Sequence, residues 1–151
     1  MPTTFTNNWK NILDKLENVF RTEFSPTSSG TSLPVYTGEV NEKAGSQYLR
    51  FDPVGSDLVE YNSQSETREY SINMFLYFGD KSESRRKLDA VLRLVSRIES
   101  LVVDNISMTL SDSSNLFNCR IESTELDSDE DDTENYVVLF NYKCMHLGNV
   151  G

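Results

Sequence analysis

The chain has 151 residues, 37% of them hydrophobic, and carries a formal net charge of -10 at pH 7. This length fits a single domain with a modest hydrophobic core. The negative charge disfavours attachment to nucleic acid or to an anionic membrane, because binding to phosphate polymers depends on clustered Lys and Arg. The sequence has neither an apolar run long enough to span a membrane nor a signal-peptide core. We therefore expect a protein of cytosolic origin.

The sequence carries no motif for nucleophilic catalysis or for cofactor binding. His146 is the only histidine, and no Gly-x-Ser-x-Gly elbow is present, so a serine or cysteine triad has little support. Cys119 and Cys144 lie in strand-like segments without a metal-ligand pattern, and we interpret them as small buried apolar residues.

A magnesium nuclease would need paired carboxylates followed by a Lys on adjacent strands. Glu39, Glu42 and Lys43 come nearest to this pattern, but they fall at a hairpin end without a second carboxylate strand. We therefore expect a protein that is not an enzyme, with no catalytic residue, no cofactor and no metal site. Weak binding of a divalent cation by the acidic run described below stays open.

The first predicted element is a helix that Asn7 or Asn8 can cap and that ends near Phe24. Ser25 and Pro26 stop it, and the polar loop 25–32 is expected to be mobile. Apolar residues recur at helical spacing and predict a helix packed on a core. They are Trp9, Ile12, Leu13, Leu16, Val19 and Phe20.

Three short strands are predicted next, at 33–40, 47–51 and 58–61. Residues 41–46 suit a hairpin connection between the first two. Asp52, Pro53 and Gly55 are expected to break the second strand. Residues 62–68 are polar and predict a turn into the next strand.

The richest apolar stretch, 69–103, predicts a strand followed by a helix. The strand alternates with Tyr70, Ile72, Met74, Leu76 and Phe78 on one face. The helix opens after a cap at Ser82 or Ser84, and its stripe should cover the sheet. That stripe consists of Leu88, Val91, Leu92, Val95, Ile98 and Val102, with Ala90, Leu94 and Leu101 on a flank that could make a second contact.

Strands are predicted after the helix at 106–110, 116–123 and 136–145, followed by a short frayed C-terminus at 148–151. The last strand has apolar residues on both faces, which predicts a central position in the sheet. The whole chain, 1–151, therefore predicts one α+β domain: a mainly antiparallel sheet with two helices packed on one face. The other face should expose an apolar patch of the kind that marks interfaces. Its residues are Phe75 and Tyr77, with Tyr48, Val137 and Leu139 as further candidates.

An acidic loop at 122–134 contains eight carboxylates. Asp127, Asp129 and Asp131 repeat as in a calcium loop, but position six would be Asp132 instead of Gly and position twelve would be Val138. We interpret the run as a solvated hairpin tip, because like charges repel and stay exposed.

A basic cluster crowds the start of the second helix, where the helix dipole disfavours positive charge. One interpretation is a solubilising surface. The other is a head-to-tail contact in which the cluster meets the acidic loop of a neighbouring copy. The cluster consists of Lys81, Arg85, Arg86 and Lys87.

The order of these elements resembles the tail terminator and tail-completion proteins of tailed bacteriophages, over nearly the whole chain. The most similar segments are W-K-N-I-L-D-K-L at 9–16 and Y-S-I-N-M-F-L-Y-F-G-D-K-S-E-S-R-R-K-L at 70–88. The resemblance implies a virion protein, assembled in the host cytoplasm, that forms a ring, usually a hexamer. Such a ring caps the tail tube and joins it to the neck and connector proteins.

The charge agrees with that implication, since DNA slides best through a ring whose lumen repels phosphate. DNA would then pass nearby without specific binding. Five acidic residues would face the lumen or a partner. They are Asp127, Asp129, Glu130, Asp131 and Asp132. The expected subunit interface consists of Lys81, Arg85, Arg86, Lys87, Leu94, Leu101, Phe75 and Tyr77.

Two alternatives stay open. Within the same assembly, the chain could be a neck stopper, a head-completion protein or a tube protein. From another class, an acidic inhibitor or immunity protein could mimic nucleic acid and block a basic partner. A ring protein should tolerate neutralisation of the acidic loop, whereas a mimic should lose its activity.

Overall fold

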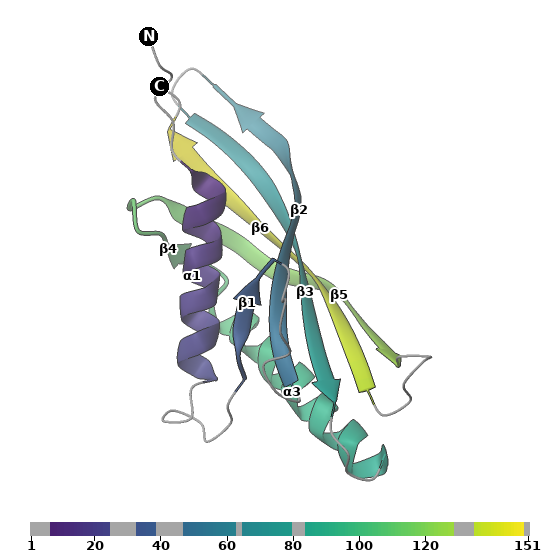
Figure 1. Ribbon diagram of the computed structural model, residues 1–151. Coiled ribbons are helices and arrows are strands. Elements are labelled where there is room, and N and C mark those ends of the chain that lie inside the picture. Colours follow the sequence, from purple (N-terminus) through teal and green to yellow (C-terminus); the bar gives the residue numbers. More distant parts are fainter. Residues whose placement is uncertain are drawn as a thin grey trace.

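The computed structural model describes residues 7–24, 33–38, 47–62, 65–79, 84–128 and 135–149 (Figure 1). They form a mixed six-stranded sheet in the order β1-β2-β3-β6-β5-β4, with two helices. Neither described helix is long and apolar enough to cross a membrane. The architecture confirms the predicted α+β fold. The elements are α1 (Asn8–Glu23), β1 (Val35–Thr37), β2 (Gln47–Tyr61), β3 (Ser65–Gly79), α3 (Ser84–Asp104), β4 (Met108–Thr109), β5 (Asn115–Ser128) and β6 (Asn135–Asn149).

Helix α1 begins and ends as the sequence predicts. The Asn7 side chain caps it by accepting a hydrogen bond from the Lys10 amide at 3.1 Å, which satisfies one of the free donors of the first turn. Ile12, Leu16 and Phe20 are its buried residues and lie on one face. This face packs on the sheet, and in Figure 1 the helix runs alongside β1.

Strands β3 and β6 form the centre of the sheet and confirm the central position predicted for the last strand. They pair antiparallel over their whole length, with Ile72 opposite Tyr142 and Met74 opposite Phe140. All four of these side chains are buried. Because side chains alternate between the faces of a strand, this register puts the core residues of both strands under the helices.

Strand β2 corrects the predicted break. It runs without interruption from Gln47 to Tyr61, and register shifts between Pro53 and Gly55 and between Leu58 and Glu60 absorb the irregular residues. β1 pairs parallel with β2, so these two strands are not the antiparallel pair that a hairpin would give. The connection expected at 41–46 lies outside the described residues. The β1 pairing ends opposite Phe51. Pro53 is tolerated because it follows that point, where β2 has become an edge strand.

The other strands differ from the prediction mainly in length. β3 already begins at Ser65, inside the predicted turn, and β4 shortens to two residues. β5 continues to Ser128, so residues 122–128 of the expected acidic loop belong to a strand. β6 reaches Asn149, and Gly148 pairs with Glu66, so the strand includes the first half of the expected frayed terminus. Hydrogen bonds to the neighbouring strands keep these polar residues in strands, although their composition predicts turns.

Helix α3 is rotated relative to the predicted stripe. Leu94 is 7% exposed and belongs to the core, whereas Leu92 is 44% exposed. Leu94 is buried because it stands one turn from both Val91 and Ile98, which are fully buried. Leu101 is partly buried against the same core. The predicted interface role of Leu94 is therefore wrong, and the flank packs within the molecule.

Arg97 ties the two helices together. Its guanidinium donates to the Glu23 carboxylate at 2.9 and 3.0 Å and to the Glu23 carbonyl at 3.3 Å. The same group stands over the Phe24 ring, 5.0 Å from its centroid. An Arg that combines a forked hydrogen bond with an aromatic contact fixes the angle between two elements.

Packing between α1 and the sheet predicts a large cost for truncating Phe20, which lies 5.2 Å from Phe51 in edge-to-face contact and is 1% exposed. We expect Phe20→Ala to lower the free energy of unfolding by about 3–5 kcal/mol, since a cavity replaces the ring. Val103→Ala, at a position 64% exposed, should change it by only about 0.5 kcal/mol. Urea denaturation measures both, and equal effects would contradict this packing.

Candidate interaction surface on the open sheet face

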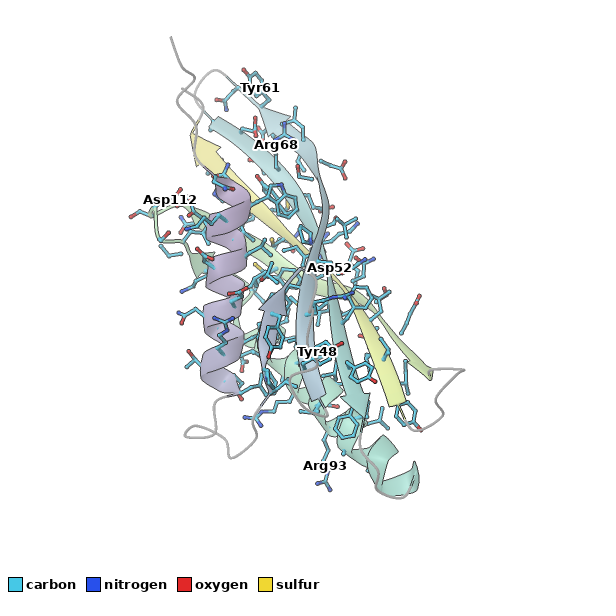
Figure 2. The ribbon with its side chains drawn as sticks, in the orientation of Figure 1. Tyr48, Asp52, Tyr61, Arg68, Arg93 and Asp112 are labelled. Atoms are coloured by element: carbon cyan, nitrogen blue, oxygen red, sulfur yellow. The ribbon has the colours of Figure 1, made fainter. Side chains whose placement is uncertain are left out.

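Aromatic side chains from three neighbouring strands form a row on the sheet face opposite the helices. Tyr36 of β1 meets Tyr48 of β2 edge to face at 6.2 Å between centroids. Tyr48 then stacks on Tyr77 of β3 at 5.1 Å with an interplanar angle of 19°. Figure 2 shows Tyr48 on the lower half of β2. All three rings are partly exposed, so they present a continuous aromatic surface to the exterior.

Arg50 and Phe75 extend this row. The Arg50 guanidinium stands over the Phe75 ring, 4.8 Å from its centroid, and contacts Asp52 at 2.9 Å. Val137 and Leu139 on β6 pair with Tyr77 and Phe75 and lie on the same face. We call these residues the open-face row. It consists of Tyr36, Tyr48, Arg50, Phe75, Tyr77, Val137 and Leu139.

The open-face row has a defined arrangement in the single chain. Each ring is held by a neighbour, and Arg50 is fixed at its tip by Asp52, while its buried Nε atom has no hydrogen-bond partner in the described residues. A binding partner would meet side chains that have already lost much of their rotamer freedom. Ordering such side chains on binding costs about 0.5–1.5 kcal/mol each when they start out free.

A charged network occupies the same face further along β3, β5 and β6. Arg120 contacts Glu69 at 2.9 Å and Glu122 at 2.7 Å, and Lys143 lies 3.8 and 3.7 Å from the same two carboxylates. Its hydrogen bond to Glu69 raises the pKa of Arg120. These four charges cancel, so the open face carries a compensated polar end and an apolar end.

Only part of the predicted interface can be compared with the structure. Phe75 and Tyr77 lie on the open face, as expected. For the charged residues of the predicted interface and of the acidic loop, the structure describes no side chain. Lys81 and the acidic residues Asp129, Glu130, Asp131 and Asp132 lie outside them, and Arg85, Arg86, Lys87 and Asp127 are described only as backbone within α3 and β5.

Sequence reasoning missed a second exposed apolar group on β2. Val54, Leu58, Val59 and Tyr61 are between 52% and 61% exposed. They follow the point at which β1 stops, and Figure 2 shows Tyr61 at the far end of the hairpin. The signal was present in the β-branched and aromatic residues of 54–61, but the expected break at Asp52–Gly55 concealed it.

A polar cluster joins His146, the one residue of the group that the sequence singles out, to the loop before β5. His146 Nε2 lies 2.9 Å from Ser114 Oγ, and Asp112 accepts hydrogen bonds from the Ser114 amide and hydroxyl. The cluster borders a cavity of about 510 Å³ that Asn8 and Gly148 also line. Figure 2 shows Asp112 in the loop beside α1.

The hydrogen bonds of this cluster do not connect the three residues in the way that a catalytic triad requires. A triad carboxylate orients the histidine, whereas Asp112 binds the serine. The amides that could stabilise an oxyanion are also occupied, because Ser113 donates to Leu110 and Ser114 donates to Asp112. Burial lowers the pKa of His146, so the ring is neutral near pH 7. The arrangement fits a structural link between β6 and the 110–115 loop.

No protein-family model matches the chain, and no curated protein matches it by sequence. Solved structures match it in fold. One of them superposes on 92% of this chain and 97% of its own with a TM-score of 0.50, at 15% sequence identity. At this identity the likeness concerns the fold alone.

The buried His146 predicts an acid-sensitive component of stability. Because its pKa is lowered from 6.5 in the folded chain, the unfolded chain binds the proton first. The free energy of unfolding should therefore fall as the pH drops below about 6.5, the value of the unfolded chain. Urea denaturation followed by Trp9 fluorescence measures this dependence.

His146→Asn is the matched variant, since its amide can still donate to Ser114 while it cannot titrate. Its stability should stay level over the same interval. Hydrogen bonds from Ser114 lower the pKa of Asp112 from 3.8, so the contribution of Asp112 is lost only at lower pH. An unchanged pH dependence in His146→Asn would contradict the assignment.

Proposed function

We propose that the chain is a structural protein of a bacteriophage virion, a tail terminator that assembles as a ring on the tail tube. The observation that carries the proposal is the open-face row, a preformed apolar and aromatic surface left uncovered by both helices. Such surfaces on soluble proteins mark sites of association. A ring subunit needs one because its neighbours or the tube bury it only on assembly.

The anatomy of the open face also favours association over small-molecule binding. Aromatic and Arg side chains are enriched at the centres of protein interfaces, and here Arg50 lies among the tyrosines and Phe75. The compensated network around Glu69 and Arg120 would form a polar rim. Protein surfaces recognise one another through this combination of apolar centre and polar rim.

The charge of -10 supports the same proposal. A ring around passing DNA works best when its lumen repels phosphate. Among the described residues of the open face, Asp52, Glu69 and Glu122 are each paired with Arg or Lys. Two further carboxylates lie on the same face, since Asp57 stands opposite Glu69 and Glu125 stands opposite Leu139, and both are exposed. The nucleic-acid mimic therefore stays an alternative that the imaging of virions decides.

Cryo-electron microscopy of virions containing the protein tests the proposal. We expect a symmetric ring at the junction of head and tail, with the open-face row buried against a neighbouring subunit or the tube. Density within the neck or along the tube would instead favour the stopper or tube alternative. Absence of the protein from virions would contradict a structural function and favour the inhibitor.

Tyr77→Ser should weaken assembly without unfolding the chain. Losing one buried aromatic contact costs about 1.5–3 kcal/mol, which reduces association roughly tenfold or more. Sedimentation with purified tail tubes measures the effect, and circular dichroism checks the fold. Leu92→Ser, on the exposed side of α3, is the control and should sediment as the unmodified protein does. Equal loss in both variants would exclude the open face as the contact.

A further inference from the structure

The two cysteines face each other across a bulge between β5 and β6. Phe117 pairs with Met145 and Arg120 pairs with Lys143, so two residues of β5 stand opposite Cys144 alone. One of these two is Asn118, whose φ of 52° lies in the left-handed region. This extra residue changes the direction of the following side chain. Cys119 is thereby turned into the core beside Cys144, and both thiols are free, at 2% and 0% exposure.

The two thiols are chemically unequal. A hydrogen bond from Cys144 lowers the pKa of Cys119 to about 7, while the same interaction and burial raise the pKa of Cys144. Cys119 therefore loses its proton first. A thiolate is the nucleophilic form of cysteine, so Cys119 is the thiol of the pair that reacts with an electrophile.

Cys119 can also be approached from outside. It lines a cavity of about 260 Å³ between the end of α3 and the edge of β5, together with Val102, Val103 and Ile106. Cys144 does not line this cavity. Cys119 is itself 2% exposed, so a small neutral oxidant that enters this cavity meets the residue Cys119 before Cys144.

We propose that Cys119 and Cys144 are a dithiol oxidation site that hydrogen peroxide converts into a disulfide between β5 and β6. The Cys119 thiolate attacks one peroxide oxygen, and the O–O bond breaks to give a sulfenic acid and hydroxide. The Cys144 sulfur then attacks the Cys119 sulfur and displaces the hydroxyl group. The two thiol protons end in water, so two thiols and one peroxide give one disulfide and two waters.

The bond would link strands that are already paired, so it requires only a local approach of the sulfurs. It closes a loop that contains the acidic residues between β5 and β6. Cross-linking such a loop restricts the unfolded chain and raises stability. The site is independent of ring assembly, and its test does not depend on the proposed function.

The experiment treats the reduced, folded protein with hydrogen peroxide, then denatures it in the presence of N-ethylmaleimide. Intact-mass spectrometry should show two maleimide adducts before treatment and none after it. Peptide mapping should find residues 119 and 144 joined, and the thermal midpoint of the oxidised protein should rise. Two free thiols, or a sulfinic acid on Cys119 with Cys144 still free, would overturn the proposal.

Two variants separate the steps. Cys144→Ser should accumulate a sulfenic acid on Cys119, which dimedone traps as a covalent adduct. Cys119→Ser should leave Cys144 unmodified at the same peroxide concentration. Reaction of Cys144 at an unchanged rate in Cys119→Ser would overturn the order of attack, provided that circular dichroism shows both variants folded.

Discussion

The structure depends on burying one face of the β3–β6 ladder beneath α1 and α3. Alternation puts Ile72, Met74, Phe140 and Tyr142 on this face, and each is 1% exposed or less. Both helices must then lie on the same side, because their apolar stripes have this one surface to cover. Arg97 fixes the helices to each other through Glu23, so the layer above the sheet acts as one unit.

The same alternation explains why the opposite face is a candidate interface. A strand that is apolar at nearly every position presents apolar residues on both sides, and two helices cover only one of them. Phe75, Tyr77, Val137 and Leu139 are left on the open side. The stacking of Tyr48 on Tyr77 and the contact of Arg50 with Phe75 organise this surface without a covering element, which leaves it available to a partner.

Bulges in β2 and β5 decide which side chains of these strands are exposed and which face the core. On β2 they let Pro53 and Gly55 remain within one long strand, whose outer half is an edge with exposed apolar residues. On β5 a bulge at Asn118 brings Cys119 to Cys144. An edge strand with a proline and bulges is a poor template for unintended pairing. The exposed side chains of β2 can therefore contact a partner, while the backbone of the edge strand does not promote aggregation.

Several features of this protein can be predicted from local sequence pattern alone. The Asn7 cap, the stripe of α1, the alternation of β3 and β6, the α+β class and the open-face position of Phe75 and Tyr77 all follow from spacing. Tertiary structure decided the rest: the rotation of α3 that buries Leu94, the parallel pairing of β1, the continuity of β2 and the cysteine pair. These depend on which distant segment lies alongside, and pairing with a neighbouring strand outweighs the weak preferences of Pro, Gly and polar residues. The cluster of Asp112, Ser114 and His146 was hidden for the same reason, since 32 residues separate the serine from the histidine.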